Sequence, residues 1–267
     1  ISVPISIIAN PTPQISGDTF TCNYNTETYI ASNTRSGSSF TWNHSSGSAL
    51  SSINDTLFQI FWLNNSTAQI IFTETNIDGC SANDTLNINL KSKPNPIFTG
   101  LDTVCSGNTL NYIAQAQQGI YYAWNVDSAS ILSSQGNDSV SINWLNPGLH
   151  NLELIVTDSA TGCDSTYEFQ VWVDSTPVFT LSGDNPVCLN EPNQTYQVSS
   201  SIQANYAWNL ATGGNITANG NSANIIWNSI GNHQISVQAL RPISGCSYNV
   251  NYDVKVNPKP QTSAISD

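Results

Sequence analysis

Apolar and polar residues alternate along much of this chain with a period of two, the spacing of a strand with one buried face. Residues 139–144 and 167–173 show the pattern clearly, with aromatic or branched aliphatic side chains at every second position. Turns rich in glycine, proline and asparagine separate such stretches, and no ten-residue stretch has helical periodicity. Six or seven short strands in this arrangement predict an all-β fold of sandwich type.

The strand pattern recurs three times in the same register. Three cysteine pairs each span 58 residues and follow one another at intervals of 83: Cys22 and Cys80, Cys105 and Cys163, Cys188 and Cys246. Two tryptophans accompany each pair at offsets of 82 to 84 residues, and we expect all six in the cores: Trp42, Trp62, Trp124, Trp144, Trp208 and Trp227.

This register predicts three tandem domains, at residues 10–93, 94–175 and 176–257. Residues 1–9 resemble the last strand of a preceding repeat, and residues 258–267 the start of a fourth. We therefore interpret the chain as a section of a longer array.

The even, periodic cysteines predict one disulfide in each domain and an oxidising compartment. Pairing within each repeat is favoured because it reproduces one bond three times. Such a bond would join the entry segment of each domain to its last hairpin. Free buried thiols and a metal site are the alternatives, although the chain has no Cys-x-x-Cys sequence.

Composition narrows the possible partners. Charged residues make up 9% of the chain and the net charge is −12, which argues against nucleic acid and anionic membrane surfaces. No stretch is long and apolar enough for direct membrane insertion. Because 39% of the residues are apolar, each repeat still has enough hydrophobic side chains to form a core.

The sequence contains no catalytic motif, and we expect no enzymatic activity. His150 and His233 occupy equivalent positions in separate repeats, so capping a turn is the favoured role for each.

Two further sets of residues are candidates for binding. Asp18, Asp102 and Asp184 recur near the linkers, which makes calcium at the domain junctions the one cofactor to consider, with simple turn-forming aspartates as the alternative. Trp172 breaks the repeat pattern by pointing outward on a terminal strand. It is expected to form an interdomain contact or part of a binding patch.

The repeats share short sequences: a Pro-x-Pro opening, Val-Cys at 104–105 and 187–188, Tyr-x-Trp at 122–124 and 206–208, and Gly-Cys at 79–80, 162–163 and 245–246. These sequences resemble the PKD-like, Ig-like repeats of large surface and secreted proteins of Bacteroidota. The first repeat departs from the pattern with Thr21-Cys22 and Phe40-Thr41-Trp42. The resemblance implies three tandem Ig-like (PKD-like) β-sandwich domains in an elongated array.

Arrays of this kind typically belong to adhesion or gliding-motility proteins exported by the type IX secretion system. The resemblance therefore implies a structural stalk or filament segment of a large extracellular adhesin. Its partners would be neighbouring repeats, and also surface polysaccharide or other cells. The alternative is an accessory, weakly glycan-binding array of a secreted enzyme that degrades polysaccharide or protein. Self-association is a third possibility, because residues 1–9 could add as a strand to a neighbour.

The resemblance also implies O-glycans, which proteins of that phylum carry on Asp-Ser or Asp-Thr followed by a small or aliphatic residue. Eight positions fit, and glycans there would keep this weakly charged surface soluble: Thr56, Thr85, Thr103, Ser128, Ser139, Ser159, Ser165 and Ser175.

Overall fold

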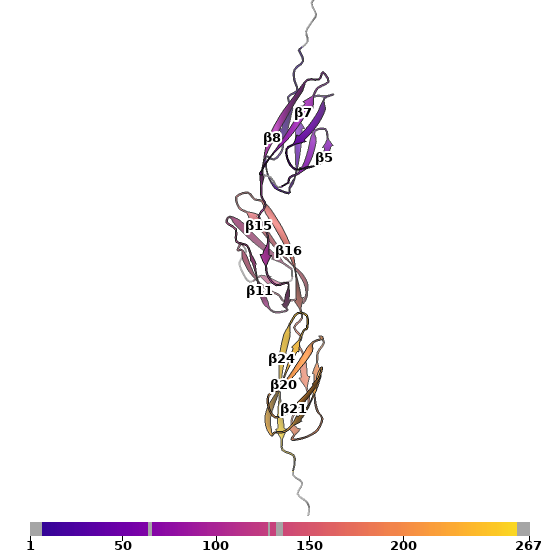
Figure 1. Cartoon of the computed structure of the whole chain (residues 1–267), viewed down its shortest axis with the longest axis vertical. Helices are drawn as coiled ribbons and strands as arrows, with labels where there is room; N and C mark the ends of the chain where they lie inside the picture. Colours follow the sequence, from indigo (N-terminus) through magenta and orange to yellow (C-terminus); the bar gives the residue numbers. More distant parts are fainter. Residues whose placement is uncertain (1–6, 64–65, 128, 132–135, 261–267) are drawn as a thin grey trace, which may run out of the picture.

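The computed structural model describes residues 7–63, 66–127, 129–131 and 136–260 of the chain. These residues form strands and turns, and none of them belongs to a helix that could cross a membrane. Three β-sandwiches follow one another along the long axis of the molecule (Figure 1). The prediction of an all-β, Ig-like array is confirmed. Residues 1–6 and 261–267 lie outside the described residues, and so do most of the strand expected at 1–9 and most of the fourth repeat expected at 258–267.

Each sandwich contains two four-stranded sheets with the same strand order. In repeat 1 the sheets are β1-β3-β6-β5 and β2-β8-β7-β4, with β1(Gln14–Ser16), β2(Phe20–Cys22), β3(Thr26–Ser32), β4(Ser39–His44), β5(Ser48–Asn54), β6(Leu57–Phe61), β7(Thr67–Thr75) and β8(Ser81–Lys91). In repeat 2 they are β9-β11-β14-β13 and β10-β16-β15-β12, with β9(Phe98–Thr99), β10(Thr103–Cys105), β11(Thr109–Ala114), β12(Ile120–Val126), β13(Ser130–Ile131), β14(Ser139–Asn143), β15(Gly148–Asp158) and β16(Asp164–Asp174). In repeat 3 they are β17-β19-β22-β21 and β18-β24-β23-β20, with β17(Thr180–Ser182), β18(Val187–Cys188), β19(Gln194–Ser199), β20(Asn205–Leu210), β21(Gly214–Asn219), β22(Ser222–Trp227), β23(Gly231–Leu240) and β24(Ser247–Asn257).

A short parallel pairing near the start of each repeat sets the position of its first cysteine. The strand that carries this cysteine runs beside the C-terminal end of the last strand, so Cys22 pairs with Lys91, Cys105 with Asp174 and Cys188 with Asn257. The second cysteine directly precedes the same last strand, which is 11 residues long. The two cysteines of one repeat therefore lie at opposite ends of their sandwich. We call these the exit end, near the first cysteine, and the entry end, near the second.

Each repeat buries its own hydrophobic core, and the inward residues are those expected from the period-two pattern. Four of the six repeated tryptophans are fully buried, namely Trp62, Trp124, Trp144 and Trp227. Trp42 and Trp208 are half-buried and pack against the cores of repeats 1 and 3.

A buried tyrosine on the third strand of each repeat packs edge-on against one of these tryptophans. Centroid distances are 6.2 Å for Tyr29–Trp62, 6.2 Å for Tyr112–Trp144 and 6.3 Å for Tyr196–Trp227. Each phenol donates a 3.1 Å hydrogen bond to a backbone carbonyl 11 or 12 residues earlier. Burial raises the pKa of each phenol to about 12. We call each of these buried, hydrogen-bonded tyrosines a tyrosine corner. The hydrogen bond fixes the segment between the first two strands of the repeat against the core.

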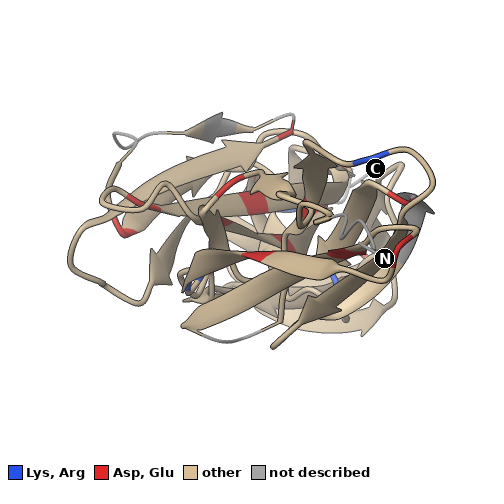
Figure 2. Cartoon of the chain, turned by 90° about the horizontal axis from the view of Figure 1, so that it is seen from above, with Lys and Arg blue, Asp and Glu red and all other residues tan. Residues whose placement is uncertain are grey.

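Figure 2 looks down the long axis and shows acidic residues scattered among uncharged ones, with few basic residues. The polar surface therefore consists mainly of neutral side chains, as the composition predicts.

Candidate functional site at the domain junctions

The disulfides connect neighbouring repeats. Cys22 of repeat 1 is bonded to Cys163 of repeat 2, and Cys105 of repeat 2 to Cys246 of repeat 3, with Cα–Cα distances of 5.7 and 5.5 Å. Both bonds span 141 residues, and Cys80 and Cys188 are free thiols. The prediction of one disulfide within each repeat is wrong, although the chain does form disulfides in a periodic register.

The direction of the last strand explains why the cysteines pair between repeats and not within one. An 11-residue strand is about 36 Å long at 3.3 Å per residue, and it separates the two cysteines of each repeat. A disulfide requires Cα atoms within about 7 Å, so pairing within a repeat is sterically impossible. The exit end of one repeat faces the entry end of the next, which brings Cys22 to Cys163 and Cys105 to Cys246.

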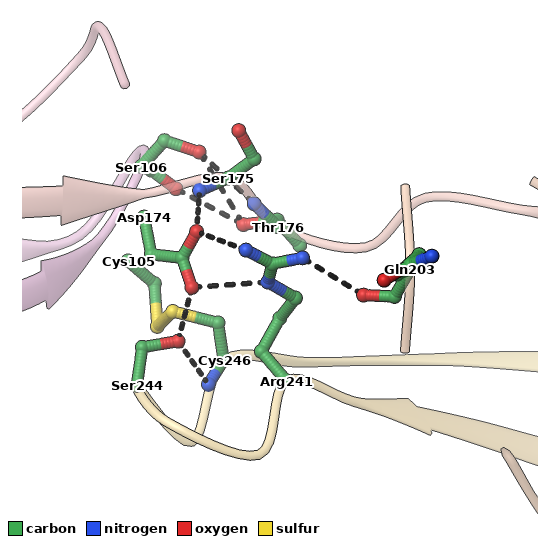
Figure 3. Close-up of polar contacts among 9 residues, drawn as sticks. All are labelled: Cys105, Ser106, Asp174, Ser175, Thr176, Gln203, Arg241, Ser244 and Cys246. Carbon is green, nitrogen blue, oxygen red and sulfur yellow. Dashed lines mark hydrogen bonds and ion pairs between the residues drawn. A yellow bond between two sulfur atoms is a disulfide. The ribbon is translucent and has the colours of Figure 1, made fainter. Parts of the chain in front are cut away.

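The junction between repeats 2 and 3 adds a bidentate ion pair beside its disulfide (Figure 3). Asp174, the last residue of β16, is 4% exposed and accepts 3.0 Å hydrogen bonds from Nε and Nη2 of Arg241 in repeat 3. Ser244 donates to the same carboxylate at 2.5 Å, and Arg241 Nη1 donates to the carbonyl of Gln203 at 2.8 Å. The planar guanidinium and the carboxylate thus fix the relative orientation of the two repeats.

Electrostatics at this junction favour the charged pair. The hydrogen bonds from Arg241 lower the pKa of the Asp174 carboxyl, and those from Ser244 and the Ser175 amide lower it further against the opposing effect of burial. Asp174 raises the pKa of Arg241 in turn. The carboxylate therefore remains ionised throughout the neutral range.

The junction between repeats 1 and 2 has oppositely charged residues at the equivalent positions, with their signs reversed. Lys91 pairs with Cys22 as Asp174 pairs with Cys105, and Asp158 lies five residues before its cysteine, as Arg241 does. Lys91 lies 6.0 Å from the ring centroid of Phe20, while Asp158 accepts hydrogen bonds from the amides of its own turn. Among the described residues, Lys91 and Asp158 therefore form no ion pair equivalent to that of Asp174 and Arg241.

A groove of about 1160 Å³ lies at the junction of repeats 2 and 3 and is bordered by Trp172. Trp172 is 47% exposed, and its amide donates to the carbonyl of Asp102. The rest of the lining comes mainly from repeat 3, including Tyr206, Arg241 and several serine, glutamine and asparagine residues. Trp172 therefore borders a surface shared by two repeats.

The other predicted polar residues remain apart. Asp18, Asp102 and Asp184 belong to different repeats, and no three His, Cys, Asp or Glu side chains cluster suitably for a metal within the described segments. Asp18 and Asp184 instead supply carbonyls to the tyrosine corners. His150 and His233 contact the carbonyls four residues before them at 2.8 and 3.0 Å, as expected of turn caps.

The candidate glycosylation positions differ in accessibility. Thr85, Ser139 and Ser159 are exposed, whereas Thr56, Thr103, Ser165 and Ser175 are half-buried. Ser128 lies outside the described residues. Ser175 directly follows Asp174, whose carboxylate already accepts hydrogen bonds from Arg241. Ser175 is therefore the candidate position least suited to a bulky modification.

Sequence reasoning missed the glycines that make the tyrosine corners possible. Gly17, Gly100 and Gly183 lie against the rings of Tyr29, Tyr112 and Tyr196, and an added Cβ would come within 2.1 to 2.4 Å of those rings. The signal was present in the sequence, because the three glycines also recur at intervals of 83 residues. Asp174 and Arg241 gave no such signal, because the other repeats carry different residues at the equivalent positions.

The solved structures that match this chain are only distantly related to it in sequence. Invasin, a bacterial integrin-binding protein, is 14% identical with a TM-score of 0.41, and the match covers 92% of this chain and 59% of invasin. The eight N-terminal Ig domains of Down Syndrome Cell Adhesion Molecule are 10% identical with a TM-score of 0.49, covering 94% of this chain and 37% of that one. A Bacteroides ovatus glucan-utilisation protein, SGBP-B, is 12% identical with a TM-score of 0.25, covering 94% and 72%.

No curated protein sequence is similar enough to this chain to serve as a relative. The family model described as PKD-like domain matches residues 174–256, which contain nearly all of repeat 3 and begin at Asp174 of the junction. The chain thus consists of Ig-like β-sandwich repeats, of which the third matches the PKD-like domain.

Proposed function

We propose that this chain is a non-catalytic spacer, a segment of the stalk of a large extracellular adhesin. The observation that carries the proposal is the disulfide across each of the two described junctions. Each junction is crossed by two covalent connections, the disulfide and the linker, which comprises residues 92–97 or 175–179. Two connections restrict bending far more than a single flexible linker does.

The dimensions suit a spacer. A last strand of 11 residues measures about 36 Å, so three sandwiches and their linkers extend on the order of 120 Å. The disulfides also favour an oxidising, extracellular location, where such bonds persist.

The wider setting rests on the resemblance to Bacteroidota repeats. It favours an adhesion or gliding-motility protein exported by the type IX secretion system, carrying O-glycans at exposed positions such as Thr85, Ser139 and Ser159. Cell-surface polysaccharide or other cells would then be the partners of the whole adhesin. The PKD-like match over residues 174–256 supports the domain type in this proposal.

Small-angle scattering of the oxidised protein tests the spacer. We expect the molecules to have a narrow distribution of overall dimensions, with a longest dimension on the order of 120 Å. A Cys163→Ser/Cys246→Ser variant lacks both bonds and should give a broader distribution, whereas Cys80→Ser/Cys188→Ser should resemble the unaltered chain. A broad, flexible ensemble for the unaltered chain would refute the proposal.

Weak glycan binding is a second candidate function, favoured by the groove beside Trp172. A half-exposed tryptophan next to polar side chains provides an apolar face and hydrogen-bonding groups for a sugar. A glycan array should show binding that Trp172→Ala abolishes and that Tyr121→Ala, at another half-exposed aromatic residue of repeat 2, preserves. Absence of binding by the unaltered chain would exclude this function.

A further inference from the structure

The two free cysteines occupy the same positions as the bonded ones. Cys188 lies at the exit end of repeat 3, in register with Cys22 and Cys105, and Cys80 lies at the entry end of repeat 1, in register with Cys163 and Cys246. The first and third sandwiches therefore each have one unpaired half of a junction, at the end that no described repeat covers.

The backbone around Cys188 already has the conformation found at the bonded exit ends. Leu189 N donates to Asn257 O at 2.9 Å, as Ser106 N donates to Asp174 O at 2.8 Å. The carbonyl of Cys188 accepts from the amide three residues later at 3.3 Å, and the carbonyl of Cys105 does the same at 3.1 Å. No rearrangement is needed to present the Cys188 thiol.

The turn that carries Cys80 is likewise preformed. Asn76 N donates to Cys80 O at 2.9 Å, matching Asp158 to Cys163 at 2.9 Å and Arg241 to Cys246 at 2.8 Å. A glycine with positive φ precedes the cysteine in all three turns, although the turn of repeat 1 is one residue shorter. The counterparts Cys163 and Cys246 are 0% exposed, whereas Cys80 is only half-buried. This difference is expected if a neighbouring repeat normally covers this end.

One residue beside each cysteine has a charge that suits its counterpart across the junction, either opposite to it or neutral like it. The exit-end residue pairs with the first cysteine in the sheet, and the entry-end residue closes the turn of the second cysteine. The three combinations are Lys91 with Asp158, Asp174 with Arg241, and, for the two unoccupied ends, Asn257 with Asn76. Neither position is charged at the two unoccupied ends, so these residues bring no charge repulsion to the contact.

We infer that the Cys188 end of repeat 3 and the Cys80 end of repeat 1 are complementary docking surfaces for a further repeat of this kind, and that each contact is completed by a disulfide. In a solution of the pure chain the occupant is a second copy. Cys188 of one copy then bonds Cys80 of the next. This head-to-tail contact does not close on itself, so it generates linear polymers.

The bond formation needs an oxidant, and glutathione disulfide supplies it. The Cys80 thiolate first attacks glutathione disulfide, forming a mixed disulfide and releasing one glutathione. The Cys188 thiolate then attacks the Cys80 sulfur and expels the second glutathione. In total, two protein thiols become one disulfide, and one glutathione disulfide becomes two molecules of glutathione.

This inference deepens the proposed spacer function by naming the partner of its two ends. The test is to incubate the concentrated chain in a glutathione redox buffer and to identify crosslinked peptides by mass spectrometry. Random collision would give the 80–80, 188–188 and 80–188 links in the ratio 1:1:2. We expect at least a tenfold excess of 80–188 over either symmetric link, and a ladder of multimers on non-reducing gels.

Variants separate the two halves of the contact. Cys80→Ser and Cys188→Ser should each remain monomeric alone, whereas their mixture should form a dimer with a single 188–80 bond. The 1:1:2 ratio, symmetric dimers of the single variants, or no crosslinking at all would overturn the inference. The scattering experiment concerns the stiffness of three repeats, so either result is interpretable without the other.

The neighbouring charges provide a test of geometry. An Asn257→Asp/Cys80→Ser copy mixed with an Asn76→Asp/Cys188→Ser copy can form only the link that has a carboxylate on each side of the contact. We expect this link to form roughly tenfold more slowly than the link between the two single cysteine variants. An Asn257→Lys/Cys80→Ser copy mixed with the same Asn76→Asp/Cys188→Ser copy recreates the Lys91 and Asp158 combination and should restore the rate. Equal rates for both mixtures would show that the thiols react without the junction geometry.

Discussion

A single substitution in repeat 2 should destabilise repeat 1. Cys163 lies in repeat 2 but is bonded to Cys22, so Cys163→Ser removes the constraint on the exit end of repeat 1. When repeat 1 unfolds in the unaltered chain, residues 22–91 form a closed loop anchored to folded repeat 2 through the disulfide and the linker. In the variant the same unfolded segment is anchored at one end only.

The loop length sets the magnitude. For a loop of about 70 residues, the chain-entropy relation gives roughly 15 cal/mol/K, or about 4 kcal/mol at 25 °C. Because each 1.4 kcal/mol is a factor of ten in an equilibrium constant, repeat 1 should open about 10³ times more often. Repeat 2 also loses a constraint, whereas repeat 3 keeps its bond to Cys105.

Hydrogen exchange measured by mass spectrometry resolves the three repeats within one chain. Amides of β3 and β6 should lose protection by about three orders of magnitude in Cys163→Ser, while those of β22 and β23 should be unchanged. Cys22→Ser should give the same loss in repeat 1. The double variant should lose no more than either single variant, because all three remove the same bond.

Two outcomes would refute this reasoning. Unchanged protection of β3 and β6, with loss confined to repeat 2, would mean that the bond lies within a repeat. An equal loss on Cys80→Ser would mean that removing any cysteine destabilises repeat 1, since Cys80 is free.

Three further predictions concern single sites. Gly100→Ala should destabilise repeat 2 by about 1–3 kcal/mol in thermal unfolding, since the new Cβ would lie 2.1 Å from the Tyr112 ring; an unchanged melting temperature would contradict this packing. Asp174→Asn should remove an acid-sensitive step: the folded pKa of Asp174 is lowered, so its stabilising effect is present above the unfolded pKa of about 4 and lost as pH falls through the folded value. Exchange at Arg241 should therefore accelerate below pH 4 in the unaltered chain but not in the variant. Tyr112 and its two counterparts should ionise near pH 12 in an absorbance titration. Since their pKa values are raised from 10.0, their contribution to stability is complete below pH 10 and lost as pH rises towards 12. Full ionisation of these tyrosines near pH 10 in the folded chain would refute the prediction.

Much of the fold follows from local patterns in the sequence. Strands such as Ser139–Asn143 and Gly148–Asp158 coincide with stretches whose alternate residues are apolar, because a strand with one buried face requires that spacing. The repeated tryptophans are in or against the cores because such large apolar side chains gain most from leaving water.

The disulfides show where local patterns end. An 83-residue period is equally consistent with bonds spanning 58 residues and with bonds spanning 141, since the second number is the first plus one period. The sequence thus determined which cysteines are equivalent, how many repeats the described chain contains and that each is a β-sandwich. Tertiary structure decided their pairing, because the short parallel strand carries each first cysteine to the far end of the sandwich, beyond reach of its own repeat and against the next. The same long-range placement brings Asp174 to Arg241, a contact between residues 67 positions apart that no local periodicity predicts.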